Sequence, residues 1–266
     1  MMLEGNFVRR ARTGALIVGT AVLCLPLTAS RAPVSVVVTH HVRIPAGSPS
    51  STAPTAAGWA SSNWSGYAIT GGPFRSATAR WVVPSVGATS GASFSATWVG
   101  IDGFNDNNLI QTGTEQDYYS GRAHYYAWWE ILPAAETVIN SIAVQPGDLM
   151  KASLKQGTGG SWTISITDVT RSQSFTTHHQ YSAPLSSAEW IQEAPSVGSR
   201  TATLAHYKSF VFDPGTANGV APGLTAADGG LLIQNGHQVS TPSNPDSDRD
   251  GFRIAYGSAT PAAPSS

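Results

Sequence analysis

The sequence predicts an all-β fold in which two antiparallel sheets form a sandwich. Short runs rich in β-branched and aromatic residues recur from Trp59 onward. Gly, Pro, Asn and Ser separate these runs, and no segment keeps the 3.6-residue apolar period of a long helix. The chain has 266 residues, which is enough for one sandwich domain with a substantial core. We therefore expect a single β domain.

Composition excludes some classes of function. The formal net charge is -1 and charged residues make up 12% of the chain, so the chain has no general electrostatic attraction to nucleic acid or anionic membrane. The chain has one cysteine, Cys24, and it lies in an N-terminal apolar run. A mature protein without that run has no thiol and no disulfide, which excludes a thiol enzyme.

The chain divides into four parts. Residues 1–30 have a basic start, an apolar core and a small-residue exit, which predicts a secretory signal peptide and an extracellular protein without a membrane anchor. Residues 31–58 are rich in Pro, Ser, Thr and Ala and are expected to be a propeptide or linker. In this part we expect His40 and His41 to be a solvated pair. Residues 59–257 form the β domain, and residues 258–266 a flexible tail.

The strand signals are separated by turn residues, and Asp213–Gly230 is expected to be a loop-like insertion. We expect strands at Trp64–Ile69, Ala77–Val83, Ser95–Asp102, Leu109–Thr112, Tyr125–Leu132, Asp148–Lys155, Trp162–Asp168, Ser172–Thr177, Glu189–Glu193, Ser209–Phe212, Leu231–Ile233 and Phe252–Tyr256.

The stretch from Trp98 to Thr114 is the first candidate for function. It is expected to form a strand, a polar loop, and a second short strand that ends at a tight turn at Gly113. Alternation along the first strand places Trp98, Gly100 and Asp102 on one face, which suits a binding surface. In the second strand Gln111 offers two donors and an acceptor without charge. A polar residue that simply closes a strand is the alternative.

The segment Tyr125–Pro133 holds the densest aromatic cluster. If it is extended, Tyr126, Trp128 and Glu130 share one face, and an indole lies beside a carboxylate. The alternative is that both tryptophans simply pack between the sheets.

The segment Glu189–Glu193 alternates in the same way, so its two glutamates share a face. We expect one of them to be exposed and the other to serve a groove. A carboxyl group among apolar and aromatic neighbours has a raised pKa, which suits a general acid or base. A solvated edge strand is the alternative.

Metal motifs are weak. The segment Asp246–Gly251 (DSDRDG) imitates the start of a calcium loop, but the closing acidic ligand would fall on Gly257. It is interpreted as a polar turn before the last strand. The chain has no HExxH zinc motif and no GxSxG nucleophile motif. We expect no metal and no cofactor.

Several segments together resemble the glutamic peptidase (eqolisin) family. They are SSNWSGYA (Ser61–Ala68), the strand end Trp81–Pro84, WVGIDG (Trp98–Gly103), LIQTG (Leu109–Gly113), YAWWEILP (Tyr126–Pro133), the PGD turn (Pro146–Asp148) and AEWIQE (Ala188–Glu193). The resemblance implies a concanavalin A-like (lectin-like) sandwich of two antiparallel sheets with the active site on the concave side. It also implies peptide cleavage at acid pH by a catalytic Gln/Glu pair, which falls on Gln111 and Glu193.

The resemblance further implies that Trp98, Asp102, Trp128 and Glu130 line the substrate groove. Two positions depart from the fungal members: Tyr126 replaces an acidic residue, and Glu115 replaces an aspartate. The expected substrates are polypeptides, and we expect a monomer.

Two other functions fit parts of the same pattern. A glycoside hydrolase could use Glu130 and Glu193 as its carboxylate pair. A carbohydrate-binding module could use the tryptophans as stacking platforms, but it would leave Gln111 and Glu193 with no shared task.

Overall fold

The structure is a computed structural model that describes residues 1, 36, 38–47 and 58–266. The expected signal peptide and Cys24 lie outside the described residues, as does part of the expected propeptide or linker. The described part of the chain holds no helix with the length and apolarity that a membrane crossing requires.

The strand signals of the sequence correspond to strands of the structure, with ends shifted by a few residues. The strands are β1 (Val38–Thr39), β2 (Trp59–Ser61), β3 (Trp64–Thr70), β4 (Ser76–Val82), β5 (Ala96–Ile101), β6 (Ile110–Tyr119), β7 (Arg122–Ile131), β8 (Thr137–Ile139), β9 (Leu149–Gln156), β10 (Ser161–Asp168), β11 (Gln173–Gln180), β12 (Ser187–Glu193), β13 (Ser196–Val197), β14 (Arg200–Thr201), β15 (Phe210–Phe212), β16 (Thr216–Ala217), β17 (Gly229–Gln234), β18 (His237–Pro242) and β19 (Phe252–Tyr256). Two short 3-10 turns complete them, η1 (Thr158–Gly160) and η2 (Ala226–Asp228).

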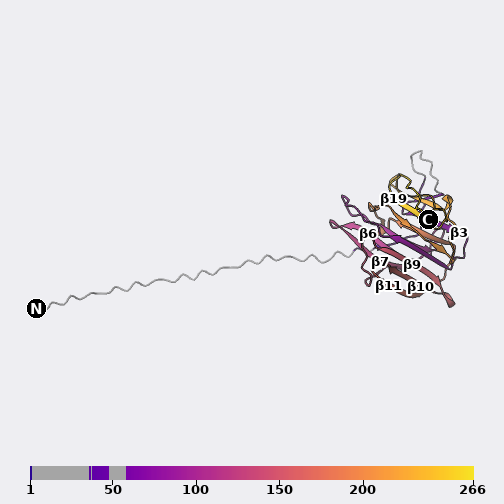
Figure 1. The fold of residues 1–266 in the computed structure, drawn as a ribbon, viewed down its shortest axis with the longest axis horizontal. Helices are drawn as coiled ribbons and strands as arrows, with labels where there is room; N and C mark the ends of the chain where they lie inside the picture. The colour runs from indigo at the N-terminus through magenta and orange to yellow at the C-terminus, as the bar shows by residue number, and fades with distance from the viewer. Residues whose placement is uncertain (2–35, 37, 48–57) are drawn as a thin grey trace. The chain divides into compact units, whose positions relative to one another are not determined.

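The strands form two packed layers, which confirms the predicted sandwich (Figure 1). Hydrogen bonds link them in the order β11-β10-β9-β4-β15-β19-β18-β17-β3-β12-β5-β6-β7-β8, and each neighbouring pair is antiparallel. We call β3, β12, β5, β6 and β7 sheet I, and β4, β9, β10 and β11 sheet II. Strands β4, β9 and β10 contact β5, β6 and β12 across the interior. The layers therefore enclose a common core.

The core consists of alternate side chains from both sheets. Trp81 and Ile164 of sheet II belong to the same buried cluster as Val99, Ile101 and Trp190 of sheet I. These side chains are at most 1% exposed. Burial of a large apolar side chain contributes about 1.5–3 kcal/mol to the free energy of unfolding, so the core between the two sheets is a main source of stability.

The opposite face of sheet I is also buried, whereas antiparallel sheets commonly expose one face to solvent. A second cluster on this face contains Trp64, Trp98, Trp128 and Ile191. The segment 38–46, which we call the strap, runs along these residues. Its main chain bonds to the domain at Arg43 N to Gly103 O (3.1 Å), Ser62 N to Ile44 O (2.9 Å) and Ala46 N to Ala60 O (3.2 Å), and β1 pairs with β13.

The expected turn at Gly113 is wrong, because β6 continues through this residue to Tyr119. A Cβ atom at Gly113 would lie 2.2 Å from Thr97 O and 2.5 Å from Trp98 Cβ. The glycine therefore allows β5 and its indole to approach closely. The chain reverses instead at Ser120-Gly121, where φ is 53° and 78°. Two consecutive positive φ values are typical of a two-residue hairpin turn.

The insertion Asp213–Gly230 contains more structure than the sequence predicts. It includes β16, which pairs with β4, and the turn η2. The strand β18 was not predicted either, although Asn235-Gly236 before it has φ values of 52° and 77° and is a hairpin signal. The last residues contact the domain, since Arg253 Nε donates to Ala262 O at 3.2 Å.

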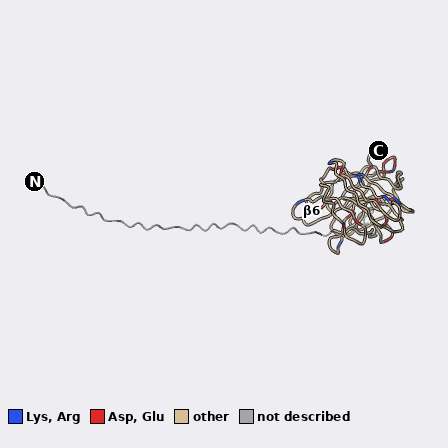
Figure 2. The backbone as a smooth tube through the Cα atoms, turned by 90° about the horizontal axis from the view of Figure 1, so that it is seen from below, with Lys and Arg blue, Asp and Glu red and all other residues tan. Residues whose placement is uncertain are grey.

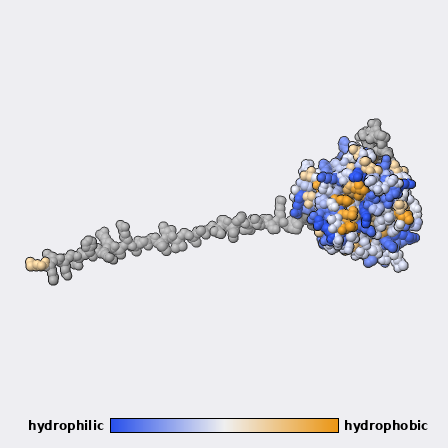
Figure 3. Space-filling model, viewed as in Figure 1, coloured by the Kyte–Doolittle hydropathy of each residue, from blue (hydrophilic) through white to orange (hydrophobic). Residues whose placement is uncertain are grey.

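The surface carries few charges, as the composition indicates. Figure 2 shows short blue and red stretches on a largely tan backbone. In Figure 3, hydrophobic residues form a band near the middle of one face, with hydrophilic residues around it.

Candidate active site

The register of sheet I places both predicted catalytic residues on the face that points away from the core. Directly opposite residues of antiparallel strands share a face. One row across β12, β5, β6 and β7 consists of Glu189, Gly100, Gln111 and Glu130. The next row is Ile191, Trp98, Gly113 and Trp128, and the third is Glu193, Ala96, Glu115 and Tyr126. Gln111 and Glu193 therefore lie on the same face, on strands separated by β5.

The Glu193 carboxylate is buried and held by nitrogen donors. Trp98 Nε1 donates to Glu193 Oε2 at 2.9 Å. Asn63 Nδ2 donates to Oε1 at 3.4 Å, and the main-chain N of His41 donates to the same oxygen at 3.2 Å. The indole and the amide fix the orientation of the carboxylate, while the third donor belongs to a peptide group of the strap.

Gln111 is paired with Glu130 across the β6–β7 ladder. Gln111 Nε2 donates to Glu130 Oε2 at 2.7 Å, and Gln111 Oε1 is buried without a hydrogen-bond partner. Burial raises the pKa of Glu130 to about 8, although the charge of His40 and two hydrogen bonds act in the opposite direction. A neutral Glu130 carboxyl group has a donor of its own. This donor is the hydrogen-bond partner that Gln111 Oε1 lacks.

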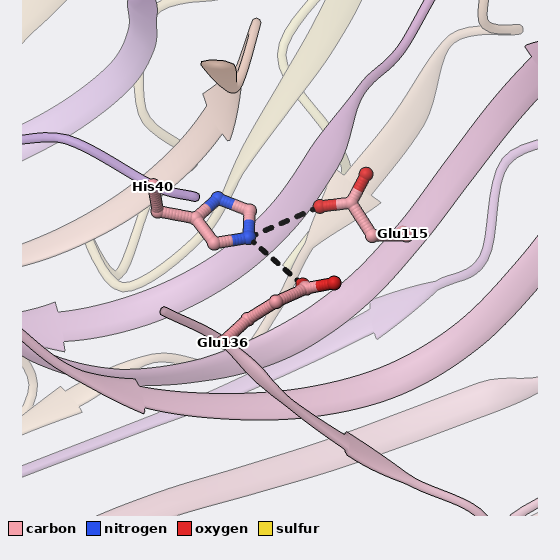
Figure 4. A group of neighbouring side chains, drawn as sticks. All are labelled: His40, Glu115 and Glu136. Atoms are coloured by element: carbon pink, nitrogen blue, oxygen red, sulfur yellow. Dashed lines mark hydrogen bonds and ion pairs between the residues drawn. The ribbon is translucent and has the colours of Figure 1, made fainter. Parts of the chain in front are cut away.

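His40 of the strap occupies the centre of this face and is completely buried. Its ring stacks on Trp128, with centroids 3.8 Å apart and planes at 9°. Its Nδ1 lies 3.2 Å from Glu193 Oε2. Its Nε2 lies 3.2 Å from Glu115 Oε1 and 3.3 Å from Glu136 Oε2, and Figure 4 shows both carboxylates directed at this nitrogen. The expectation of a solvated histidine pair is therefore wrong for His40.

The surrounding carboxylates keep His40 protonated. Burial alone lowers the pKa of His40, but the contacts of its ring nitrogens with the Glu115, Glu136 and Glu193 carboxylates outweigh this effect and raise the pKa well above its usual value. Burial also raises the pKa of Glu115, against the effect of the His40 charge. His40, Glu115 and Glu136 offer ligand atoms within 4.8 Å of one another. Because both ring nitrogens already face carboxylate oxygens, the imidazolium itself takes the place of a cation in this cluster.

Asp102 is not brought together with the other predicted site residues. Strand β5 ends at Ile101, and Asp102 has a φ of 70°, so the alternation of the strand no longer places its side chain. Its carboxylate accepts from Ser186 N at 2.7 Å, Leu185 N at 3.1 Å and Tyr181 Oη at 2.8 Å. These contacts fix the turn before β12 and so support the strand that carries Glu193.

Glu189 differs from the sequence prediction, because neither glutamate of β12 is exposed. Both carboxylate oxygens of Glu189 are buried without a hydrogen-bond partner. Burial raises its pKa well above the usual value and so favours the neutral carboxyl group.

The sequence placed Tyr126 on this face and singled out Glu115, but it indicated no contact for either residue and gave no signal for Glu136. Tyr126 Oη donates to Glu136 Oε1 at 2.9 Å. Glu115 follows from the same strand alternation as Gln111, since the two are four residues apart on β6. Glu136 lies between β7 and β8, where periodicity gives no signal.

Comparison with known proteins decides the family. The family model described as Peptidase A4 family matches residues 62–256, most of the chain. The chain belongs to the Peptidase A4 family. Aspergillopepsin-2 from Aspergillus niger is 28% identical over 178 residues, which cover 57% of this chain and 62% of that protein. The chain thus spans less than two thirds of that relative's length.

Solved structures of other peptidases share the fold of this Peptidase A4 chain. Scytalido-glutamic peptidase with a transition state analog inhibitor superposes with a TM-score of 0.63 and 23% identity, over 73% of this chain and 98% of that one. Aspergilloglutamic peptidase from Aspergillus niger gives a TM-score of 0.52 and 24% identity, over 62% of this chain and 99% of that one. Membership of a peptidase family leaves the glycoside hydrolase and carbohydrate-binding alternatives without support.

Proposed function

We propose that the chain is a secreted acid endopeptidase in which Gln111 and Glu193 activate one water molecule. One observation carries this proposal: an extended peptide of the chain itself, the strap, lies on the face that holds both residues. A main-chain N–H of that peptide donates to Glu193. Its His40 ring stacks on Trp128, which belongs to the same buried cluster as Trp98. A face that accommodates one extended peptide in this way suits a polypeptide substrate.

In the proposed reaction, Glu193 removes a proton from a water molecule that attacks the scissile carbonyl carbon. The side-chain amide of Gln111 donates to the oxyanion that forms, a role worth roughly 10²–10³ in rate. Glu193, now protonated, passes its proton to the leaving amine as the C–N bond breaks. One carboxyl group serves first as base and then as acid. Trp98 Nε1 keeps this carboxylate in position.

The Gln111–Glu130 pair supports activity below about pH 8, where the Glu130 carboxyl group is neutral. In the present arrangement Gln111 Nε2 is engaged by Glu130. Below the raised pKa of Glu130 its carboxyl group is neutral and can donate to Gln111 Oε1 once the amide turns over. The Gln111 N–H groups are then free for the oxyanion. Glu130 is thus a positioning residue that acts through Gln111.

The strap supports synthesis as a latent precursor, and of the two expectations for residues 31–58, a propeptide or a linker, it favours the propeptide. His40 fills the position beside Glu193, and Arg43 Nε donates to Phe104 O at 3.2 Å at the rim. The Arg43 guanidinium also lies 4.3 Å from the centre of the Phe104 ring. A substrate peptide cannot occupy the same positions, so cleavage or displacement of the strap must precede turnover.

The test is proteolysis of denatured casein by the purified full-length chain after incubation at about pH 4, where carboxyl groups are close to their usual pKa. We expect Glu193→Gln and Gln111→Ala to reduce cleavage to background with unchanged melting temperatures. The matched control is Glu189→Gln, the same substitution on the same strand, which should retain activity. Casein cleavage by either catalytic variant at near the wild-type rate would exclude the proposal.

A further inference from the structure

Three carboxylates from two segments that are far apart in the sequence meet beside β15 and β19. Asp213 follows β15, and Asp246 and Asp250 precede β19. The antiparallel pairing of these strands, with Phe212 opposite Phe252, brings the two segments together. Their carboxylates each offer an oxygen, and these oxygens lie within 4.8 Å of one another.

The Asp246 residue is only 6% exposed. One of its carboxylate oxygens accepts hydrogen bonds, and the other has no hydrogen-bond partner. Asp246 Oδ1 accepts from the main-chain N of Asp250 at 3.1 Å and of Gly251 at 3.2 Å. Asp246 Oδ2 is buried without a hydrogen-bond partner, and so is Asp250 Oδ1. A buried carboxylate oxygen without a donor is costly, because it has lost its water without a replacement.

Within the part of the chain that the structure describes, no basic side chain neutralises the cluster. Among residues 38–47 and 58–266, no lysine or arginine forms an ion pair with these three aspartates. Arg249, which lies within the same loop, turns away: its Nε donates to Leu224 O at 2.8 Å. Burial and repulsion from the neighbouring aspartates, Asp248 included, raise the pKa of Asp250 to about 6 and also raise that of Asp213.

The loop is shaped around the free oxygen. A Cβ atom at Gly251 would lie 2.3 Å from Asp246 Oδ2 and 2.9 Å from Asp213 Cβ, so only glycine fits here. In the sequence DSDRDG, aspartates occupy the first, third and fifth positions and glycine the sixth, as at the start of a calcium loop. The sequence lacks the acidic residue that normally closes such a loop at the twelfth position. Asp213, from a distant strand, supplies a carboxylate in its place.

We propose that Asp213, Asp246 and Asp250 form a calcium site that joins the 213–228 segment to the start of β19. An all-oxygen donor set selects a hard cation. Calcium accepts six to eight oxygens in flexible geometry, whereas magnesium demands near-ideal octahedral geometry, so an irregular carboxylate triad favours calcium. The ion would be structural, since the segment also bonds through Gly215 N to Asp250 O (2.8 Å) and Leu224 N to Arg249 O (2.9 Å). This assignment replaces the expectation, from sequence, of no metal.

The test is terbium luminescence of the full-length chain at pH 7 and 25 °C. Trp190 is a built-in sensitiser, because a Cβ atom at Gly215 would lie 2.7 Å from its indole nitrogen and Gly215 bonds to Asp250. We expect saturable luminescence that calcium displaces at a concentration at least tenfold lower than magnesium. Asp246→Asn and Asp213→Asn should each weaken binding at least tenfold. The matched control Asp248→Asn lies in the same loop but outside the triad, and should change affinity less than threefold.

A thermal melt provides the second measurement. Calcium at about 100 times its dissociation constant should raise the melting temperature of the wild-type chain by about 5–10 °C over the same protein in EDTA. Asp246→Asn should show no calcium-dependent increase. The proposal is overturned if the wild-type chain gives no luminescence, if magnesium displaces terbium as well as calcium does, or if Asp246→Asn retains wild-type affinity.

Discussion

Replacing His40 by alanine should convert a latent chain into an active one. The imidazolium lies 3.2 Å from Glu193 Oε2 and 3.2 Å from Glu115 Oε1, with Glu136 Oε2 at 3.3 Å, and it stacks on Trp128. Removing one partner of a buried ion pair costs about 3–5 kcal/mol. Each 1.4 kcal/mol is a factor of ten in an equilibrium constant, so the ratio of docked to undocked strap should fall roughly 100-fold or more.

The assay is the initial rate of cleavage of a fluorogenic peptide at about pH 4, the region where carboxyl groups titrate, by full-length chains that gel analysis shows to be intact. We expect the wild-type chain to show a lag and His40→Ala to start without one. His41→Ala is the matched control, because the contact of His41 with Glu193 is made by its main-chain N–H, which alanine keeps. Equal initial rates for intact wild-type and His40→Ala chains would refute the role of the strap.

Three further outcomes follow from the same geometry. Glu130→Gln mimics the neutral carboxyl group, so its activity at acid pH should stay within about tenfold of wild type. As the pH rises, kcat of the wild-type enzyme should fall because Glu130 ionises, whereas kcat of the variant should not show this fall. An inactive variant would contradict this prediction. Because the pKa of His40 is raised above its usual 6.5, its contribution to docking is complete below about pH 6.5 and is lost as the pH rises through the raised value. In a Gln111→Ala background, trypsin should therefore cleave after Arg43 faster as the pH rises from 7 to 9. When His40→Gln is added to that background, the cleavage rate should follow trypsin's own pH profile. Parallel pH profiles for the chains with and without His40→Gln would contradict this role of His40. Gly113→Ala forces a Cβ atom to within 2.2 Å of Thr97 O and should cost about 1–3 kcal/mol in urea unfolding or prevent folding, whereas Gly157→Ala, with its nearest atom at 3.4 Å, should cost well under half of that.

Strand alternation predicted much of the candidate site. Trp98, Trp128 and Glu130 lie on the expected face because β5 and β7 are regular through these positions. Alternation failed at Asp102, where a positive φ beyond the end of β5 redirects the chain. It also misplaced a turn at Gly113, since a glycine required for close strand approach looks in sequence like a turn glycine.

The strap could not be predicted from composition. Residues 38–46 lie within a segment rich in Pro, Ser, Thr and Ala, and their docking depends on partners from distant strands. His40 is buried because four separate segments supply Glu115, Trp128, Glu136 and Glu193 around it. The calcium cluster was set aside for a similar reason, because its third carboxylate, from Asp213, lies more than thirty residues before the loop.

The most direct measurement is a high-resolution crystal structure of the processed enzyme, without the strap, at acid pH. We expect one ordered water molecule within about 3.2 Å of both the Gln111 side-chain amide and a Glu193 carboxylate oxygen. A structure in which no single water molecule contacts both groups would contradict it.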